Sequence, residues 1–394
     1  MTSASAAGKL RVALLTREYP PEVYGGAGVH VEYLARELAP LVELTVHCQG
    51  PDRPGAVAHQ AWDRLAGANQ ALQTISADLS MTAAAADAEL VHSHTWYANL
   101  AGFLAARLYS IPHVVTTHSL EPLRPWKAEQ LGGGYALSSW CERTAVESAS
   151  AVIAVSDGMR EDVLAAYPAV SASRVRVIRN GIDTVEYSPD PATDVLERFG
   201  VDPQRPSVVF VGRVTRQKGL PVLLRAAAGL DRSAQLVICA GQADTPELEA
   251  EVAELARELL ANRAGVIWIS GMLAKREVIQ LLTHATVFAC PSLYEPLGIV
   301  NLEAMACGTA VVGSQVGGIP EVVADGETGL LVPSADPGAL ADAMNVLVAD
   351  QDLAAEMGRR GRARAEAEFG WAAIAAQTAA LYAELTAEGF PGRS

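Results

Sequence analysis

Short runs of apolar residues alternate with helical patterns along the whole chain. Residues 11–16 form the first run, and apolar residues at helical spacing follow at 30–39. Such runs are typical of strands buried on both faces, and strands separated by helices predict βαβ units in a parallel sheet. In the first half we expect strands at 11–16, 43–48, 90–94, 113–118, 151–156 and 175–181, with helices at 30–39, 98–109 and 135–149.

A stretch rich in proline and aspartate, residues 181–206, interrupts this pattern, and we interpret it as a connection between domains. A second series of strands is expected at 207–213, 235–241, 266–271, 286–292 and 310–315. The sequence therefore predicts an α/β protein with two doubly wound domains, 1–185 and 186–370, followed by a final amphipathic helix within 371–394. Ligands of such domains bind at the carboxyl ends of the strands, and two of them facing each other form a cleft.

Composition narrows the class of protein. The chain has 394 residues, of which 50% are hydrophobic, and this suits two domains with large cores. Its formal net charge of -15 argues against nucleic acid or an anionic membrane as a partner. The five cysteines form no CxxC pair, and no apolar run is long enough to span a membrane, so we expect a cytoplasmic protein with reduced thiols.

The loop at 212–219, GRVTRQKG, follows an expected strand and carries Arg213 and Lys218. The planar guanidinium of arginine and the point charge of lysine can both bind phosphate oxygens. A solvated basic loop is the alternative. Because the loop follows a strand in an acidic protein, phosphate binding and a solvated basic loop are equally well supported.

The segment that begins at Glu295 supplies a second candidate site. An apolar run follows Pro296 and predicts a helix with proline at its start, which leaves the backbone N–H groups of Leu297, Gly298 and Ile299 free for a phosphate. Glu303 lies further along this helix, in an apolar stretch where an unpaired charge is costly. Glu295 and Glu303 are therefore candidates to hold sugar and ribose hydroxyls.

Two further features lie in the first half. Gly25 and Gly26 precede an expected helix, where glycine allows the backbone to approach a phosphate closely. The run has no third glycine and lies beyond the end of its strand, so a nicotinamide-binding oxidoreductase is disfavoured. A single histidine is more often structural than catalytic, but His118 ends an expected strand, and this position strengthens the case for a role in the site.

These stretches resemble the retaining GT-B glycosyltransferases of family 4 along nearly the whole chain. The resemblance rests on GGAG at 25–28, NGID at 180–183, GRVTRQKG at 212–219, the Glu-x7-Glu pair of 295–303, GGIPE at 317–321 and GETGLLV at 326–332. It implies a GT-B fold of two Rossmann-like domains facing across a cleft, the first binding the acceptor and the second the nucleotide sugar. It also implies that the last helix crosses back to pack on the first domain.

Within the family, the chain is most similar to actinobacterial glycogen-synthase-like enzymes that use ADP-glucose, on the evidence of residues 16–31, 92–102, 117–135 and 290–312. The resemblance implies retaining transfer of glucose to α-glucose 1-phosphate, giving α-maltose 1-phosphate for glycogen and α-glucan synthesis. It implies that Glu295 holds the donor glucose, that Glu303 holds the ribose and that His118 lies near the anomeric centre. Arg213 and Lys218 then stabilise the leaving diphosphate.

Two motifs depart from ordinary bacterial glycogen synthases. Val23 precedes Tyr24-Gly25-Gly26 where those enzymes carry Lys-x-Gly-Gly-Leu, and His94-Thr95-Trp96 stands where many have His-Asp-Trp. Direct elongation of glycogen is therefore the alternative function and not the main one. A family-4 transferase for another phosphorylated acceptor, such as inositol phosphate, and a non-catalytic sugar-nucleotide-binding protein also stay open.

The loop after His118 is the candidate acceptor site. Arg124 and Lys127 could bind a phosphate, Trp126 offers a stacking surface, and a glycine triplet precedes Tyr135. On the residues alone, a surface loop whose charges pair with Glu121 and Glu129 is favoured, and the resemblance shifts the balance towards phosphate. We assign the acceptor to Arg124, Trp126, Lys127, Tyr135 and His94.

No metal or cofactor is expected, with ADP-glucose acting as the donor substrate. The single Asp-x-Asp, at 350–352, lies in a helical region without a strand before it, so a surface turn is expected there. The expected partners are a nucleotide sugar and a sugar phosphate, with α-glucan and a second copy of the chain as further options.

Overall fold

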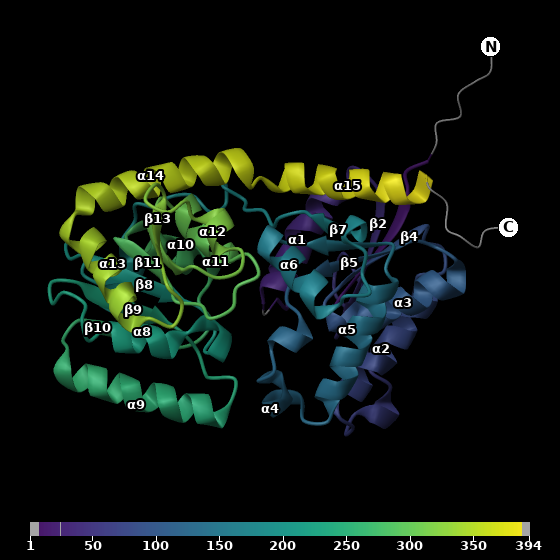
Figure 1. Ribbon diagram of the computed structural model, residues 1–394, viewed down its shortest axis with the longest axis horizontal. Helices are drawn as coiled ribbons and strands as arrows, with labels where there is room; N and C mark the ends of the chain where they lie inside the picture. The colour runs from purple at the N-terminus through teal and green to yellow at the C-terminus, as the bar shows by residue number, and fades with distance from the viewer. Residues whose placement is uncertain (1–7, 24, 388–394) are drawn as a thin grey trace, which may run out of the picture. The chain divides into compact units, whose positions relative to one another are not determined.

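The computed structural model describes residues 8–23 and 25–387 and divides the chain into two compact units (Figure 1). The N-terminal unit comprises residues 1–180 and 371–394, and the C-terminal unit comprises 181–370. The first unit thus ends before the boundary at 185 that the sequence suggested. Parts of the sequence-based assignments at 1–7, Tyr24 and 388–394 lie outside the described residues.

The described residues of the N-terminal unit form a seven-stranded parallel sheet in the order β3-β2-β1-β4-β5-β6-β7. Its strands are β1 (Arg11–Thr16), β2 (Glu43–Gln49), β3 (Val57–His59), β4 (Leu90–His94), β5 (His113–Thr117), β6 (Ala151–Ala154) and β7 (Val175–Val177). Its helices are α1 (Gly26–Leu38), α2 (Gln70–Ala84), α3 (Trp96–Tyr109), α4 (Lys127–Leu131), α5 (Gly134–Ser148), α6 (Asp157–Ala166) and α15 (Trp371–Ala387), with short 3₁₀ turns at Asp63–Leu65, Glu121–Leu123 and Ala172–Arg174.

Strand β1 shows why this sheet is covered on both faces. Its side chains alternate between the two faces, and from Val12 to Leu15 they are apolar on both. Val12 packs in a cluster built from α1 and α15, whereas Ala13 and Leu15 pack in a cluster built from α2 and α3. A continuous apolar run is therefore needed here, as the sequence pattern indicated.

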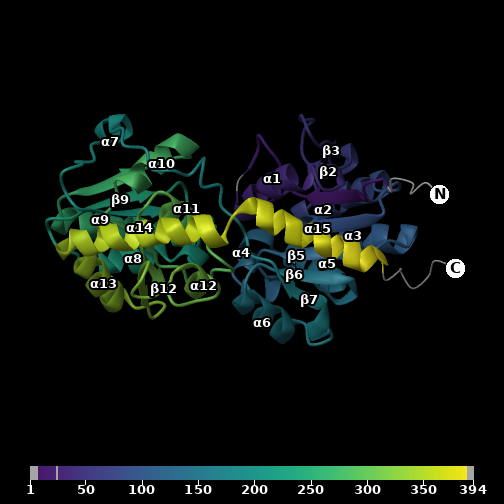
Figure 2. The same ribbon diagram turned by 90° about the horizontal axis from the view of Figure 1, so that it is seen from above.

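Helix α15 belongs to the N-terminal unit although it ends the chain. Its Trp371 ring stacks on Tyr33 of α1 with centroids 5.6 Å apart, and Ile374 and Leu381 enter the same apolar cluster. The buried Tyr382 hydroxyl makes a 2.6 Å hydrogen bond with Nδ1 of His92 in β4. Figure 2 shows this helix beside α1.

The described residues of the C-terminal unit form a six-stranded parallel sheet in the order β10-β9-β8-β11-β12-β13. Its strands are β8 (Ser207–Val211), β9 (Gln235–Cys239), β10 (Val266–Ile269), β11 (Val287–Cys290), β12 (Ala310–Ser314) and β13 (Gly329–Val332). Its helices are α7 (Asp194–Phe199), α8 (Leu220–Ala226), α9 (Pro246–Asn262), α10 (Lys275–Thr283), α11 (Ile299–Ala306), α12 (Ile319–Val322), α13 (Pro337–Ala349) and α14 (Gln351–Glu368), with a 3₁₀ turn at Arg216–Lys218.

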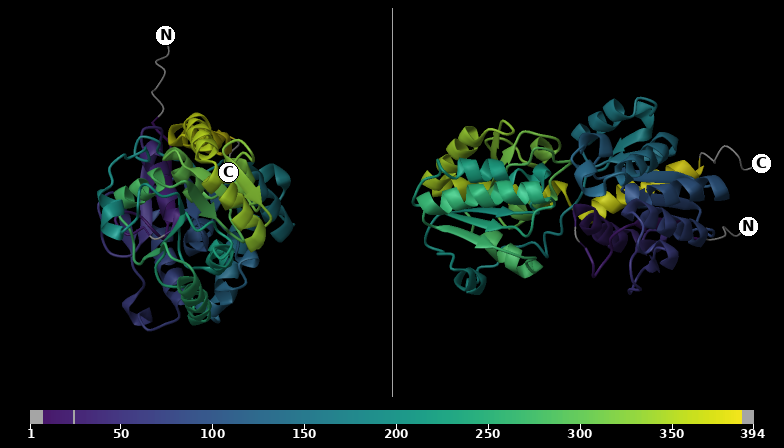
Figure 3. Two further views of the ribbon diagram at one scale, coloured as in Figure 1. Left: turned by 90° about the vertical axis from the view of Figure 1, so that its left-hand side faces the viewer. Right: turned by 90° about the horizontal axis from the view of Figure 1, so that it is seen from below.

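Both units are doubly wound α/β domains, with helices on the two faces of each sheet (Figure 3). In each sheet the strand order reverses beside the unit's first strand, between β1 and β4 and between β8 and β11. Such a reversal leaves a crevice at the carboxyl ends of the strands. The fold class expected from the sequence is confirmed. Strands β3 and β13 were not predicted.

None of the helices in the described ranges is long and apolar enough to cross a membrane.

All five cysteines are free thiols and are buried. Asp350 caps α14, since its Oδ1 accepts the N–H of Leu353 at 2.9 Å.

Candidate functional site

Lys218 and Glu295 form an ion pair at the carboxyl end of the C-terminal sheet. Lys218 ends the 3₁₀ turn that follows β8, and Glu295 lies in the loop after β11. The Nζ of Lys218 is 2.6 Å from Oε2 of Glu295, and both side chains are largely buried. Burial is the largest single effect and lowers the pKa of Lys218, but the charge and hydrogen bond of Glu295, together with the charge of Cys290, raise it, so its pKa is raised overall. Arg213 is close enough for its charge to oppose the protonation of Lys218.

Backbone contacts that need glycine hold both partners of this pair. Gly219 has φ +65°, and a Cβ there would lie 2.0 Å from the carbonyl oxygen of Pro291. Gly317 has φ +51°, and its Cβ would lie 2.0 Å from the carbonyl oxygen of Glu295, which also accepts the N–H of Gly318. Side chains at either glycine would therefore push the loops after β8, β11 and β12 apart.

Helix α11 begins at Ile299, and the expectation that Pro296 starts it was wrong. Gly298 is the N-cap residue and has φ +93°, a left-handed conformation that separates the loop from the helix. The N–H of Asn301 donates to the Gly298 carbonyl at 2.9 Å, whereas a helix leaves its earlier N–H groups without an intrahelical partner, and the helix dipole adds positive potential there. Leu297, Gly298 and Ile299 therefore lie at or just before the start of this helix, and their binding of a phosphate stays a prediction.

Glu303 lies in the second turn of α11, and burial raises its pKa to about 7. A hydrogen bond with Tyr187 and the charge of Lys218 both lower its pKa, but they do not offset the burial. The group is therefore close to half ionised near neutral pH. A carboxyl group poised in this way can accept hydrogen bonds from ligand hydroxyls once it is charged.

Three histidine rings meet in the N-terminal unit. Nδ1 of His94, at the end of β4, lies 3.0 Å from Nε2 of His118, just after β5. The His30 ring of α1 has its centroid 4.7 Å from that of His118, and its Nδ1 is 2.7 Å from Oδ1 of Asn180. Nitrogen atoms of His30, His94 and His118 all lie within 4.8 Å of one another, so these rings have the spacing of a metal site.

Burial keeps these histidines neutral. It lowers the pKa of His30 to about 4 and holds the pKa values of His94 and His118 well below the usual range, with neighbouring rings acting in the same direction on the latter two. The Nε2 atoms of His30 and His94 have no hydrogen-bond partner among the described residues. The cluster is therefore a set of neutral donors and acceptors, suited to polar ligand groups.

The glycines before α1 are arranged differently from the expectation. The helix begins at Gly26, so Gly26 and Gly28 lie within its first turn instead of in a loop before it. The N–H of Gly25 donates to Oε2 of Glu18 at 2.8 Å, so a protein carboxylate already contacts this helix start. Gly28 packs against the same side chain. Glu18 was not singled out in the sequence, because it lies in the loop before the glycine run.

The loop after His118 folds around a buried carboxylate. Lys127 is only 6% exposed, and its Nζ lies 3.3 Å from Oε1 of the buried Glu121. Ser138 donates to the other Glu121 oxygen, and the Tyr135 hydroxyl donates to the Glu121 carbonyl. Arg124 donates to the Ser119 hydroxyl at 2.6 Å. The pairing of Lys127 with Glu121 is the alternative that the residues alone favoured, while Trp126 is half-buried as the N-cap of α4.

A second carboxyl group lies beneath this loop. Glu142 accepts the N–H of Glu121 and the hydroxyl of Tyr167. Burial, reinforced by the charge of Glu121, raises the pKa of Glu142 well above its usual range. Burial therefore favours the protonated form of Glu142, which adds no negative charge to the loop.

Comparison with known proteins defines the class. The family model for Glycosyltransferase Family 4 matches residues 24–186, and that for Glycosyl transferases group 1 matches residues 194–364. The chain belongs to glycosyltransferase family 4, and it is a glycosyltransferase of the GT-B fold.

Two of its relatives are similar over their whole length. The chain is 57% identical over 387 residues to alpha-maltose-1-phosphate synthase of Mycolicibacterium smegmatis, covering 96% of this chain and 100% of that protein. It is 58% identical, with the same coverage, to alpha-maltose-1-phosphate synthase of Mycobacterium tuberculosis. D-inositol 3-phosphate glycosyltransferase of Corynebacterium jeikeium is 37% identical, over 77% of this chain and 74% of that protein.

Solved structures agree on the fold. Sucrose-phosphate synthase from Thermosynechococcus elongatus superimposes with a TM-score of 0.80 at 26% identity, covering 96% of this chain and 100% of that one. HepE of Anabaena in complex with UDP-glucose gives a TM-score of 0.77 at 22% identity, covering 95% of this chain and 100% of that one. At this identity the second likeness shows the fold alone.

Proposed function

We propose that the protein transfers glucose from ADP-glucose to the 4-hydroxyl of α-glucose 1-phosphate with retention, giving α-maltose 1-phosphate and ADP. The observation that carries this proposal is the identity of 57% and 58% to two alpha-maltose-1-phosphate synthases along their full length. The inositol-phosphate transferase is less identical and covers less of the chain. Extension of an α-glucan is the second candidate, and the departures at Val23 and Thr95 from the glycogen-synthase motifs argue against it.

In this proposal the C-terminal unit binds the donor. Lys218, Arg213 and the start of α11 face the diphosphate and stabilise the negative charge that grows on it as the bond to the sugar breaks. Because these groups are held by packed loops, they need little reorganisation during the reaction. Glu295, fixed beside Lys218, accepts hydrogen bonds from glucose hydroxyls, and Glu303 in its ionised form accepts those of the ribose.

The transfer itself exchanges one bond for another at the anomeric carbon. The bond from C1 to the diphosphate oxygen breaks, and a bond from C1 to O4 of the acceptor forms on the same face. The proton of that hydroxyl passes to the departing diphosphate, so no protein nucleophile is required. His118 is neutral and sits in a cluster of neutral rings, so it orients the sugar by hydrogen bonding without adding a charge next to the cationic transition state.

The experiment is an acceptor and donor panel. The release of nucleoside diphosphate is measured with ADP-, UDP- and GDP-glucose, each with α-glucose 1-phosphate, inositol phosphate or glycogen. Rapid turnover of ADP-glucose with α-glucose 1-phosphate supports the proposal. A higher kcat/KM for glycogen or for inositol phosphate would replace it with one of the two alternatives. The oligomeric state, an α-glucan partner and a cytoplasmic location stay predictions.

A further inference from the structure

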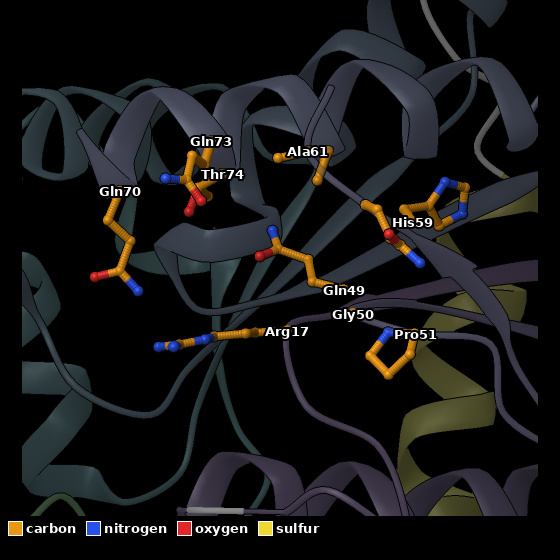
Figure 4. A pocket seen from close by; sticks show the side chains of 11 residues that line it. Arg17, Gln49, Gly50, Pro51, His59, Ala61, Gln70, Gln73 and Thr74 are labelled. Atoms are coloured by element: carbon orange, nitrogen blue, oxygen red, sulfur yellow. The ribbon is translucent and has the colours of Figure 1, made fainter. Parts of the chain in front are cut away.

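A polar pocket of about 280 Å³ opens at the carboxyl ends of β1 and β2 in the N-terminal unit (Figure 4). Arg17 follows β1 and lies on one side, whereas Gln70, Gln73 and Thr74 come from α2 on the other. Its lining residues are Arg17, Gln49, Gly50, Pro51, His59, Gln60, Ala61, Gln70, Gln73, Thr74 and Ala77. None of these residues has a role in the site predicted from the sequence.

The chemistry of the lining fits a ligand that has both hydroxyl groups and negative charge. Four glutamines and one threonine offer neutral donors and acceptors, which is the kind of lining that binds sugar hydroxyls. Burial lowers the pKa of His59, so this ring is neutral. Arg17 is then the single cation of the lining, and none of the described lining residues is acidic.

Arg17 is positioned without an acidic partner. Its Cζ lies 4.1 Å from the centroid of the Tyr97 ring, and no carboxylate within the described part of the chain forms an ion pair with it. Gln49 anchors the same residue, since its Nε2 donates to the Tyr97 carbonyl at 2.6 Å. A guanidinium held by ring stacking keeps its N–H groups available for a phosphate.

The groups around Tyr97 carry an excess of positive charge. Arg17, Arg124 and Lys127 are all near its ring or hydroxyl, and Lys127 is the one paired with Glu121. Burial favours the protonated form of Glu142, so the three cations outnumber the ionised carboxylates here, and this excess has the sign that the −1.5 to −2 charge of a phosphomonoester would neutralise. A neutral sugar alone would leave this charge uncompensated.

We propose that this pocket binds the phosphorylated acceptor as a hexose phosphate, with Arg17 on the phosphate and the glutamine amides on the hydroxyls. The inference rests on the proposed function and names the acceptor subsite that it needs. Tyr97 follows shortly after His94, whose ring contacts His118. In glucose 1-phosphate the phosphate and the 4-hydroxyl lie at opposite ends of the ring, so anchoring the phosphate beside Tyr97 directs the 4-hydroxyl away from it.

Arg17→Met in the full chain tests this inference, with Arg107→Met as the matched control. Arg107 is an exposed arginine of α3 that also lies over an aromatic ring, that of Phe103. Loss of a charged hydrogen bond corresponds to roughly a 10- to 100-fold change, so we expect KM for α-glucose 1-phosphate to rise by that factor in Arg17→Met. KM for ADP-glucose should stay within about twofold, and Arg107→Met should leave both constants unchanged.

Calorimetric titration distinguishes failure of the proposed phosphate subsite from failure of the proposed transfer reaction. The probes are α-glucose 1-phosphate, inorganic phosphate and glucose, added to the wild type and to both variants. We expect the two phosphorylated probes to bind the wild type more tightly than glucose and to lose affinity in Arg17→Met alone. Unchanged affinity in Arg17→Met, or no binding of phosphorylated probes to the wild type, would overturn the inference. If the probes bind through Arg17 but no glucose is transferred to α-glucose 1-phosphate, the subsite stands and the proposed reaction falls.

Discussion

The Nζ of Lys218 lies 2.6 Å from Oε2 of Glu295, so the cation expected on the donor diphosphate and the carboxylate expected on the donor sugar are bound to each other. Each side chain is held in place by the other, and the glycines at 219 and 317 fix the loops that carry them. A donor with both a diphosphate and a sugar would contact the two residues at once. The pair therefore acts as one unit in binding and in stability.

Lys218→Met should lower kcat by about 100-fold or more, because removing one fixed donor to a developing oxyanion typically costs that much. It should also reduce the temperature of unfolding, since Glu295 is left buried without its partner. The double variant Lys218→Met with Glu295→Gln should recover stability without recovering activity. Lys275→Met is the control, because its pair with Glu186 is partly exposed. A Lys218→Met enzyme with near-normal kcat would show that the diphosphate binds elsewhere.

Glu303 should make donor binding depend on pH near neutrality. Its pKa of about 7 lies above the value of about 4.3 for an unfolded chain, so the folded protein holds the proton to higher pH. If the ionised form binds the ribose, KM for ADP-glucose rises as the pH falls below about 7. Glu303→Gln should abolish this dependence. A KM profile that is identical in the wild type and Glu303→Gln would remove Glu303 from the donor site.

The same shift predicts how Glu303 affects stability. A raised carboxyl pKa destabilises the folded state progressively as the pH rises from about 4.3 to about 7, and the full effect is present above that range. Glu303→Gln should therefore unfold at a higher temperature than the wild type above pH 7, and the difference should shrink towards pH 4. Thermal unfolding at several pH values measures this directly, and a constant difference would argue against the raised pKa.

Lys127 should prove to be mainly a positioning residue of the acceptor loop. Removing one member of a buried ion pair costs about 3–5 kcal/mol, so Lys127→Met should destabilise the fold strongly because Glu121 loses its partner. Lys127→Met combined with Glu121→Gln should restore most of that stability. If the double variant also restores KM for α-glucose 1-phosphate, Lys127 does not bind the phosphate itself. If KM stays high, Lys127 is a direct ligand, as the sequence suggested.

The apolar pattern was sufficient to predict the fold but not all of its elements. Runs such as residues 11–16 need two apolar faces, and only a sheet covered by helices on both sides provides them. β3 was missed because it has three residues, too few to show a period. β13 was missed because it has only four residues and begins with Gly329, a residue type that is depleted in strands.

The candidate site was only partly visible in the sequence. Lys218 and Glu295 stood out because charged residues follow apolar strands, and the fold brings them together. Arg17 did not, because its partner Tyr97 lies far along the chain and the pocket draws on α2 as well. The start of α11 was predicted at Pro296, because proline is common in the first turn of a helix. Gly298 instead adopts a left-handed conformation, and the helix begins after it.

Trp371→Ala should test the packing of α15 on the N-terminal unit. Trp371 is 3% exposed and stacks on Tyr33, so its loss should destabilise the protein by about 3–5 kcal/mol. Trp140→Ala is the control, because that side chain is 51% exposed on α5 and its loss should cost about 0.5 kcal/mol or less. Denaturant unfolding followed by circular dichroism measures both, and similar small losses would contradict the packing described.

Turnover should not require a metal ion, since Lys218, Arg213 and the start of α11 can stabilise the diphosphate without one. The histidine rings at 30, 94 and 118 are the place where an ion could bind. Initial rates are compared before and after dialysis against excess chelator, and we expect them to agree. Loss of activity that returns with Mg²⁺, Mn²⁺ or Zn²⁺ would contradict this prediction.

The structure of the reaction product tests the central claim most directly. The purified full-length enzyme is incubated with ADP-glucose and α-glucose 1-phosphate, and the product is analysed by proton and phosphorus nuclear magnetic resonance together with mass spectrometry. The account predicts one equivalent of ADP for each α-maltose 1-phosphate, with an α-1,4 linkage and an unbroken α-phosphate. A β-linked product, free maltose, or ADP released without a phosphorylated disaccharide would contradict it.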